Sequence, residues 1–289
     1  MDPVQACTLA SVHIHPIKSC GGLSVDEALL IETGLEFDRA WMVVDEDGHM
    51  LTQREWPRMA LIQPTLRHND LLLRAPGMLA LHLALDAVEE PTTAQVWDDR
   101  VKAYGMGALA SQWFTDFIAP GTGRQLRLVR FDPDQKRLAS RKWTGSVDAE
   151  TAFSDAYPLL VASSASLADL NQRLAAGGTA PVTMQRFRPN LVIDGLQPWD
   201  EDHVDEIVLE ADDGPIVLRL VKPCTRCSIP NVDPASAESA SEPGTTLATF
   251  RSDPRMDGGI TFGVNAVVIE GFERGLRPGL QGRVSWKFD

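Results

Sequence analysis

The sequence contains few cysteines: four in 289 residues, at positions 7, 20, 224 and 227. Four thiols are too few for a disulfide framework in a chain of this length, and so few are typical of a reducing compartment. The first residues lack a basic segment followed by an apolar core, so no signal peptide is predicted. No apolar run approaches the roughly 20 residues that a membrane span requires. We therefore expect a cytoplasmic protein that does not enter a membrane.

Positive charge is also scarce, because 27 lysines and arginines face 40 aspartates and glutamates, and the formal net charge is −13. Neutralising nucleic-acid phosphates requires a basic surface, so we expect no nucleic-acid partner. The common phosphate-binding loop, the Gly-x-Ser-x-Gly elbow and the His-Glu-x-x-His metal helix are all missing from the sequence. The glycines at 105, 107, 121 and 123 are too dispersed for a dinucleotide fingerprint. These common catalytic classes therefore have no support in the sequence.

What the first half does contain is a series of short apolar segments. They predict strands at residues 8–15, 41–44, 49–52, 61–66, 71–74, 79–85 and 94–97. The Asp47-Gly48 pair predicts a hairpin between the second and third of them. The period changes to a helical one over 108–118. The buried stripe of that helix is predicted to consist of Leu109, Trp113, Phe114 and Phe117. Short strands at this spacing favour a barrel or a sandwich.

The second half has the pattern of a mixed, β-rich α/β region. Strands are predicted at residues 159–162, 191–193, 206–209, 216–221, 261–269 and 284–288. A helix follows the first of them, with Ser163 or Ser164 as its cap and Gly177-Gly178 at its end. The apolar stripe of this helix is predicted to be Leu167, Leu170 and Leu174. Residues 234–244 are rich in Ser, Ala, Glu and Pro and are expected to form a surface loop.

The two halves are joined by a locally basic segment. Its cations are Arg124, Arg127, Arg130, Lys136, Arg137, Arg141 and Lys142. In an acidic protein they could attract an anionic cofactor or an acidic partner protein, or they could simply form a solvated loop. Residues 132–152 have no strong pattern, and we expect a domain boundary there.

The most distinctive stretch is Lys222-Pro223-Cys224-Thr225-Arg226-Cys227, which follows the predicted strand 216–221. Pro223 is expected to end that strand and to leave both cysteines in a loop. Cations beside a thiol lower its pKa, and the thiolate is the form that binds metals and attacks electrophiles. Pro230 argues against a helix after the second cysteine, and therefore against a disulfide-exchange enzyme. The alternative is a pair of buried cysteines beneath a turn.

Other polar residues stand at predicted strand ends: Lys18, Arg39, Arg188 and Asn190. The turn of residues 15–22 could aim its lysine and backbone N–H groups at an anion, or could be a plain connection. Arg39 could instead only pair with Asp38 or Glu36. His13 and His15 are interpreted as strand-surface histidines, because a zinc site with Cys20 would have poor spacing. Together these residues indicate an anionic ligand held by cations beside one thiolate, which suits a soft or high-valent metal.

Several segments, in this order along the chain, resemble a known family. Residues 222–227, 232–233, 243 and 246–251 resemble the signature of the MOSC domain, which is named after the C-terminal part of molybdenum-cofactor sulfurase. Residues 15–22 and 37–41 resemble the β-barrel that precedes MOSC in many relatives, and residues 154–158, 166–170 and 187–190 also fit. The family includes the mitochondrial amidoxime-reducing components and the bacterial YcbX-type proteins. The resemblance implies an N-terminal β-barrel-like domain (1–120), a basic connecting segment (121–152) and a MOSC β-barrel domain with flanking helices (153–289).

The resemblance also implies a molybdenum cofactor (Mo-molybdopterin) and a set of site residues. The metal ligand and catalytic residue would be Cys227, with Cys224 in a supporting role. The cofactor-binding residues would be Lys18, Ser19, Arg39, Ser154, Asp155, Arg188, Asn190, Thr225 and Arg226. Relatives often have a Thr-Gly pair where this chain has residues 232–237, so a different loop shape is expected after the ligand.

The activity that the resemblance implies is the reduction of N-hydroxylated small molecules such as amidoximes, hydroxylamines and N-hydroxylated bases. YcbX-type proteins often carry an iron–sulfur ferredoxin domain, but this chain has no spare cysteines for a cluster. Electrons are therefore expected from a separate ferredoxin-, flavodoxin- or cytochrome b5-type protein. One alternative is a carrier of the cofactor or its sulfur without turnover of its own. Another is a zinc-binding or purely structural protein.

Overall fold

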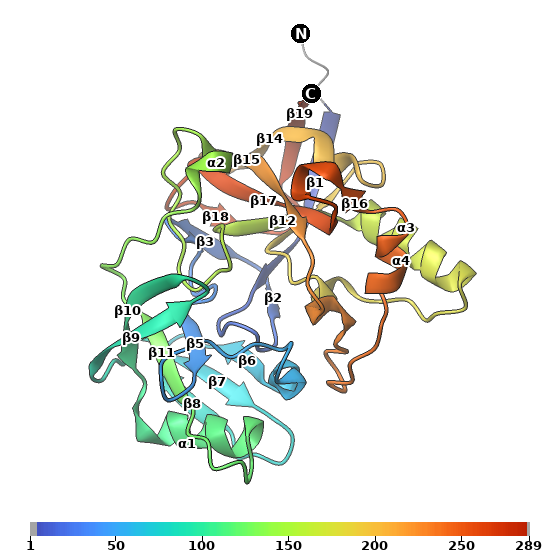
Figure 1. Ribbon diagram of the computed structural model, residues 1–289. Helices are drawn as coiled ribbons and strands as arrows, with labels where there is room; N and C mark the ends of the chain where they lie inside the picture. Colours follow the sequence, from blue (N-terminus) through green and yellow to red (C-terminus); the bar gives the residue numbers. More distant parts are fainter. Residues whose placement is uncertain (1–4, 288–289) are drawn as a thin grey trace.

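In the computed structural model of the chain, which describes residues 5–287, the largest element is a closed β-barrel (Figure 1). Each of its seven strands pairs with the next, and the last pairs with the first. In barrel order they are β12 (Leu159–Ser163), β13 (Leu191–Asp194), β1 (Gln5–Ile14), β19 (Gln281–Trp286), β14 (Val204–Ala211), β15 (Gly214–Thr225) and β17 (Gly259–Glu270). Only β12 and β13 are parallel neighbours among these described strands. The predicted β-rich barrel is therefore confirmed.

The barrel closes because its strands alternate apolar and polar residues, with the apolar side chains inward. Leu9, Val12, Ile207, Leu218 and Val284 are completely buried in its interior. β1 comes from the start of the chain, yet it lies between β13 and β19 of the second half. The first strand of the chain thus belongs to the barrel of the second half, and the predicted boundaries at residues 120 and 152 stay a prediction.

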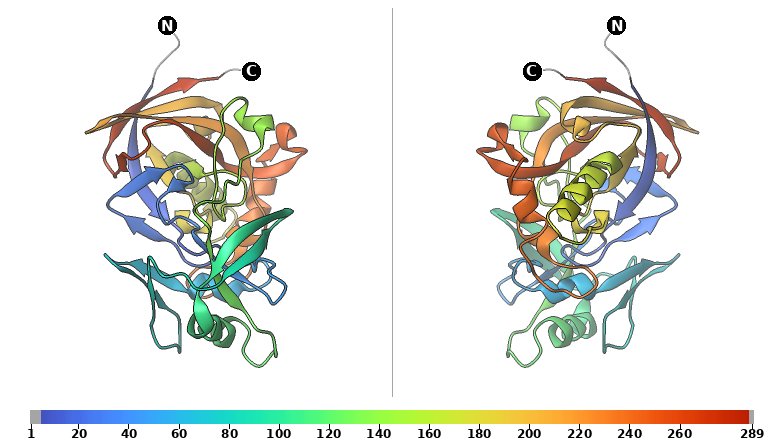
Figure 2. Two further views of the ribbon diagram at one scale, coloured as in Figure 1. Left: turned by 90° about the vertical axis from the view of Figure 1, so that its left-hand side faces the viewer. Right: turned by 90° about the vertical axis from the view of Figure 1, so that its right-hand side faces the viewer.

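The rest of the first half forms a smaller body below the barrel (Figure 2). A four-stranded sheet runs in the order β5 (Trp41–Val44), β11 (Arg127–Phe131), β10 (Asp99–Gly105) and β9 (Pro91–Val96). A three-stranded sheet consists of β6 (Gln63–Leu66), β7 (Asp70–Arg74) and β8 (Leu81–Ala84). Helix α1 (Gly107–Ile118) closes one side of the apolar core of this body.

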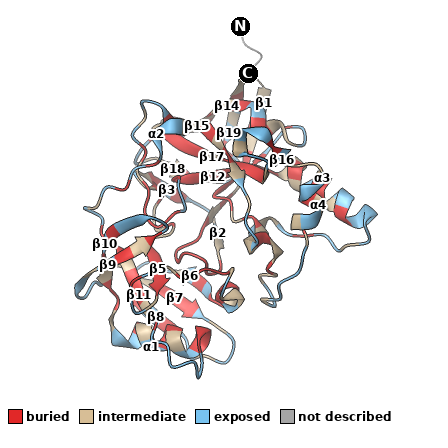
Figure 3. Ribbon diagram, viewed as in Figure 1, coloured by how far each residue is buried: buried red, intermediate tan, exposed pale blue. Residues whose placement is uncertain are grey.

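Short elements complete the fold. β2 (Leu23–Val25) pairs with β1, while β3 (Ala28–Ile31), β4 (Gly34–Leu35) and β18 (Gly275–Leu276) form a small sheet. α2 (Arg141–Thr144) lies in the connecting segment, and β16 (Ser252–Asp253) pairs with β17. α3 (Ser164–Ala176) and α4 (Gly244–Ala248) lie outside the barrel, and α3 exposes its outer face (Figure 3). Short 3-10 turns are η1 (Pro57–Leu61), η2 (Met184–Arg186), η3 (Asp200–His203), η4 (Ile229–Asn231) and η5 (Pro254–Met256).

Helix α3 begins and ends as its sequence predicts. Of the two proposed caps, Ser163 is the one used, because its Oγ accepts a hydrogen bond from the Ala165 N–H at 3.2 Å. Leu170 and Leu174 are fully buried and Leu167 is partly buried in the same cluster. The predicted stripe is therefore confirmed.

The stripe predicted for α1 is wrong at one position. Trp113, Phe114 and Phe117 are buried, but Leu109 is 75% exposed. The buried residues of α1 include Ala110 and Ile118, and at 3.6 residues per turn their common direction lies about 100° around the helix from Leu109. Leu109 therefore lies at the edge of the buried face.

Two strand predictions also need correction. The turn at Asp47-Gly48 forms, but residues 49–52 make only isolated bridges, from Met50 to Val44 of β5 and from His49 to Gln95 of β9. Pro223 does not end its strand, since β15 continues to Thr225. The pairing of β15 with β17 shifts register on both sides of Pro223, so the missing N–H falls in an irregular part of the ladder.

Candidate functional site

All ten residues that the sequence assigns to the site line one pocket between the barrel and the smaller body. They come from the 18–19 turn, from position 39, from the 154–155 loop, from residues 188–190 before β13, and from the end of β15. Cys224, to which the resemblance gave a supporting role, lines the pocket as well, and the structure adds three residues that the sequence gave no signal for: Thr52, Arg54 and Asn265. The roles of these ten residues stay predictions, but all ten residues line the same pocket.

Cys227 is exposed and stands two residues beyond the end of β15. Cys224 is half-buried and is the second-last residue of that strand. Its sulfur lies 3.0 Å from Nη1 of Arg226. Cys7 and Cys20 are buried, and burial raises their thiol pKa values to about 11 and about 12. The alternative of two buried cysteines beneath a turn is therefore wrong, and Cys227 is the most accessible of the four thiols.

The loop after Cys227 is held by an arginine that the sequence did not indicate. Arg186, at the end of η2, donates from Nη1 to the carbonyl of Pro230 at 3.2 Å and pairs through Nη2 with Asp233 at 2.8 Å. The other carboxylate oxygen of Asp233 accepts hydrogen bonds from the N–H groups of Ala235 and Ser236. The loop that departs from the family pattern is thus fixed by its own set of contacts.

Arg39 joins the two halves of the chain at the centre of the pocket. Its Nη1 donates to Asp38 Oδ2 at 2.5 Å and to Asn190 Oδ1 at 3.1 Å, and its Nη2 donates to the carbonyl of Arg188 at 3.0 Å. Burial alone would raise the pKa of Asp38, but Arg39 and His15 outweigh burial and lower that pKa to about 2. Arg39 therefore pairs with Asp38, as one interpretation predicted, and also lines the site.

His15 is not the surface histidine that the strand pattern suggested. β1 ends at Ile14, and the chain then turns inward, so His15 is 3% exposed and its Nδ1 lies 3.6 Å from Asp38 Oδ1. Burial, followed by the nearby charges of Arg39 and Arg188, lowers the pKa of His15 well below its usual value. His15 is therefore a neutral imidazole at neutral pH.

Lys18 is buried and bridges to the 153–155 loop. Its Nζ donates to the carbonyl of Phe153 at 2.8 Å and to Asp155 Oδ1 at 2.5 Å. Arg137 supports the same loop from behind, through hydrogen bonds to the carbonyls of Ser154 at 2.6 Å and Asp155 at 3.1 Å. Arg137 of the basic segment is therefore buried behind the pocket wall. It holds the 154–155 loop in place and does not line the pocket itself.

The pocket has an excess of positive charge in an acidic protein. Lys18, Arg39, Arg54, Arg188 and Arg226 line it, against one lining carboxylate, that of Asp155. Burial lowers the pKa of Arg188 to about 10, with Arg39 adding to the effect, so Arg188 remains a cation at neutral pH. Such a cluster is stabilised when an anion occupies it.

Two unfavourable features of the pocket wall also indicate a ligand site: strained backbone angles and buried polar atoms without hydrogen-bond partners. Ser19, Arg39 and Arg188 have left-handed backbone angles, with φ of 64°, 49° and 56°. Non-glycine residues in this region cost of order 1–3 kcal/mol each and cluster at functional sites. Within the described chain, the buried Ser154 Oγ and Arg226 Nε have no hydrogen-bond partner. Buried polar atoms without partners are rare in folded proteins, so these two are available to a ligand.

A zinc site at Cys20 has no support. Among residues 5–287, the acidic, histidine and cysteine side chains that approach closely enough to share a metal ion are Asp45, Asp47 and His49. These three lie on the turn after β5 and not near the buried Cys20. In the same part of the chain, no helix combines the length and the hydrophobicity needed to cross a bilayer.

Comparison with known families identifies both parts of this architecture. Residues 6–120 match the MOSC N-terminal beta barrel domain, and residues 148–280 match the MOSC domain. The fold and the site therefore define a MOSC-domain protein that carries the N-terminal barrel domain.

Comparison with curated proteins narrows the family. The chain is 36% identical over 261 residues to mitochondrial amidoxime reducing component 2 of Rattus norvegicus, covering 86% of this chain and 73% of that one. It is 35% identical over 263 residues to mitochondrial amidoxime-reducing component 1 of Homo sapiens, covering 86% and 74%. The chain therefore belongs to the family of the amidoxime-reducing components. Among solved structures it is similar to the YuaD protein of Bacillus subtilis, at 10% identity over all of both chains and a TM-score of 0.43.

Proposed function

We propose that the protein is a molybdenum-cofactor-dependent reductase of N-hydroxylated compounds, such as amidoximes, hydroxylamines and N-hydroxylated bases. The names of its relatives support the substrate class, since they are amidoxime-reducing components. The observation that supports the proposal most is the exposed thiol of Cys227 beside a pocket lined by five cations from both halves of the chain. An anionic cofactor with a soft metal matches that combination.

The residues of the pocket fit such a cofactor. Cys227 would bind the metal, and Lys18, Arg39, Arg188 and Arg226 would hold the phosphate and the electron-rich dithiolene through charge-assisted hydrogen bonds. When bound, the cofactor supplies two-electron chemistry at an oxygen atom that the protein itself cannot perform. Ser154 Oγ and Arg226 Nε, which are buried without partners, are free to bond to it.

The remaining site residues divide into direct and positioning roles. Ser19 and Thr225 line the pocket and would contact the hydrogen-bonding edge of the pterin. The amide of Asn190 is already engaged, since its oxygen accepts from Arg39 at 3.1 Å and from the N–H of Leu160 at 3.1 Å. We therefore assign to Asn190 the role of orienting Arg39.

Reduction of an amidoxime to an amidine consumes two electrons and two protons and releases the oxygen as water. Loss of hydration alone would raise the pKa of Asp155, but Lys18, Arg39 and the indole of Trp97 outweigh it and hold that pKa well below its usual value. Asp155 is therefore a carboxylate at neutral pH and cannot donate a proton. Its role is to hold Lys18 in place, and the protons come from solvent through the open side of the pocket.

The electrons would come from a separate ferredoxin-, flavodoxin- or cytochrome b5-type protein. Apart from the Cys224/Cys227 pair, the thiols of the described chain are Cys7 and Cys20, and both are buried. An iron–sulfur cluster needs four protein ligands, which these residues do not provide. A cytoplasmic location for this exchange is part of the proposal.

Metal and pterin analysis of the purified protein, followed by a benzamidoxime assay with reduced methyl viologen as the electron donor, tests the proposal. We expect molybdenum and pterin in the protein and conversion of benzamidoxime to benzamidine. Bound molybdenum without conversion would indicate a carrier, whereas zinc or no metal would indicate the structural alternative. Either result would contradict the proposed reductase.

A further inference from the structure

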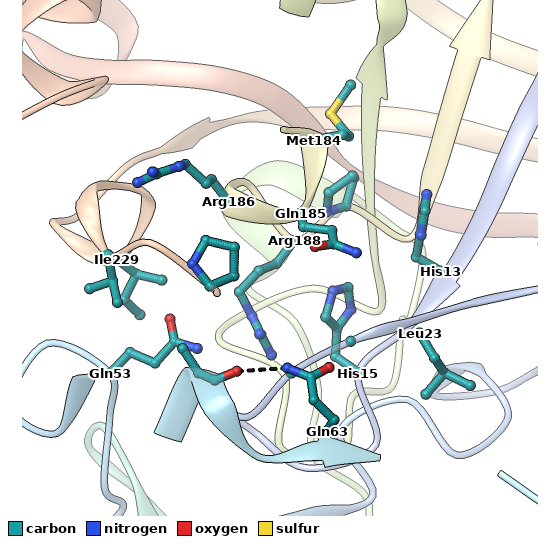
Figure 4. Close-up of a pocket in the computed structure, with 16 residues that line it drawn as sticks. His13, His15, Leu23, Gln53, Gln63, Met184, Gln185, Arg186, Arg188 and Ile229 are labelled. Carbon is teal, nitrogen blue, oxygen red and sulfur yellow. Dashed lines mark hydrogen bonds between the residues drawn. The ribbon is translucent and has the colours of Figure 1, made fainter. Parts of the chain in front are cut away.

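A second pocket lies next to the candidate site, on the other side of Arg188. Figure 4 shows Gln53, Gln63, His15 and Arg188 arranged around its space. We name it the glutamine pocket after Gln53, Gln63 and Gln185, whose amides line it together with His15, Arg188 and Ile229. It shares Arg188 and Ile229 with the candidate site, and Ile229 is two residues from Cys227. A molecule in the glutamine pocket would therefore border the candidate site.

Gln53 shows that this pocket is prepared for a polar ligand. Gln53 is only 5% exposed, yet its side-chain amide makes no hydrogen bond to any other described residue. Neither amide atom of Gln53 is among the fully buried polar atoms without a partner in the described chain, so the amide is accessible from the pocket. His15, 3% exposed, lines the same pocket, and its Nδ1 faces Asp38 Oδ1 at 3.6 Å without forming a hydrogen bond. Gln53 and His15 thus present polar atoms to this pocket that make no hydrogen bond within the described chain.

The glycine pair of the 15–22 turn keeps these groups in place. A Cβ atom on Gly22 would lie 2.4 Å from the His15 ring, and one on Gly21 would lie 2.9 Å from both amide atoms of Gln63. No side chain fits at either position without displacing the pocket wall. The same turn therefore serves both pockets, with Lys18 and Ser19 lining the candidate site and Gly21 and Gly22 lining the glutamine pocket.

The charge of the glutamine pocket restricts what it can bind. No carboxylate lines it, whereas two arginines, Arg186 and Arg188, do. Its other polar groups are amides and imidazoles, which both donate and accept hydrogen bonds. The pocket therefore suits a neutral molecule with an amide-like edge and disfavours a cation, because a like charge close to Arg188 is repelled.

This selectivity matches the two sides of the proposed reaction. An amidoxime is neutral at neutral pH, because the hydroxyl group makes its nitrogen a weak base. Reduction breaks the N–O bond, takes two electrons from the donor protein and two protons from solvent, and releases water. The amidine that remains is a strong base, so it takes up a further proton and becomes a cation.

We propose that the glutamine pocket is the substrate site: it binds the neutral N-hydroxylated molecule through Gln53 and His15 and rejects the cationic product. This inference rests on the proposed function and adds the place and the charge preference of the substrate. It also explains how product leaves, since the charge that appears on reduction faces Arg188.

Calorimetric binding of benzamidoxime and of benzamidine to the purified protein tests the inference without turnover. We expect the wild type to bind benzamidoxime more tightly. Gln53→Glu adds a carboxylate of the same shape and should shift the ratio of the two affinities toward benzamidine by roughly tenfold. Gln63→Glu, at the exposed edge of the same pocket, should shift the ratio in the same direction if the first variant does not fold. Gln172→Glu, on the exposed face of α3, makes the same charge change away from the pocket and should leave the ratio unaltered.

Three results would overturn the inference. The first is equal affinity of the wild type for the two molecules, and the second is an unchanged ratio in both pocket variants. The third is loss of molybdenum from Gln53→Glu, which would assign the glutamine pocket to the cofactor. The proposed function fails separately, through absence of molybdenum or of benzamidoxime conversion in the wild type.

Discussion

Arg39 lines the candidate site, and we predict that it also stabilises the fold. In Arg39→Lys, the charge stays but the hydrogen bonds to Asn190 Oδ1 and to the carbonyl of Arg188 are lost. At about 1 kcal/mol for each bond, we expect unfolding to become easier by about 2 kcal/mol. In Arg39→Gln, the Asp38 carboxylate, whose side chain is 1% exposed, also loses its ion-pair partner. Breaking a buried pair costs about 3–5 kcal/mol, so this variant should be the less stable of the two.

The pH dependence of the same variants provides the sharper test. The pKa of Asp38 is about 2 in the folded protein against a usual value of 3.8, so its stabilising contribution is present above pH 3.8 and is lost as the pH falls through 2. That contribution is worth about 2 kcal/mol. Without Arg39 the folded pKa rises, so the stability difference between wild type and Arg39→Gln should shrink from pH 5 to pH 2.

Urea unfolding at several pH values between 5 and 2 measures this difference. Arg67→Gln serves as the control, because Arg67 is exposed and its side chain makes no hydrogen bond or ion pair within the described chain, so its change should stay within about 0.5 kcal/mol. A stability difference for Arg39→Gln that is the same at both ends of the pH range would refute the reasoning. So would an Arg39→Lys variant as stable as the wild type.

Two further predictions concern groups that do not line the candidate site. Burial raises the pKa of Glu201 from 4.5 to about 7, so the stability of the wild type is complete below pH 4.5 and declines as the pH rises through 7. Glu201→Gln should therefore match the wild type in thermal unfolding at pH 4 and exceed it by about 3 kcal/mol at pH 8, and equal stability at pH 8 would contradict this. Arg186→Ala should expose the 228–236 loop, because its bonds to Pro230 and Asp233 are lost. Amide hydrogen exchange in that loop should accelerate by roughly tenfold or more, with exchange in α3 unchanged as the internal control, and an unaltered loop would show that Arg186 does not hold it.

The elements that depend on local sequence could be predicted. Ser163 caps α3 because its hydroxyl is the right group one residue before the helix, and the apolar spacing of Leu170 and Leu174 determines the face that α3 buries. The gathering of Lys18, Arg188 and Cys227 in one pocket could be predicted only through the resemblance to a family. Nothing local in the three segments indicates that they meet.

The features that depend on distant pairing could not be predicted. β1 joins β19, across almost the whole chain, and no pattern within either strand encodes that partner. Pro223 remains in a strand only because of how β17 pairs beside it. Gln53 was overlooked for the same reason, since an isolated glutamine becomes informative only when its surroundings bury it without a hydrogen bond.

The central claim is that the exposed sulfur of Cys227 holds a metal in the cation-lined pocket. Its most direct test is the molybdenum content of the purified wild type, of Cys227→Ala and of Cys224→Ala, expressed under the same conditions. Cys224 is the matched control, because it is the other cysteine of the same motif and lies beside Arg226. The account predicts that Cys224→Ala keeps its molybdenum and that Cys227→Ala loses it. Molybdenum retained equally by all three proteins would contradict the account.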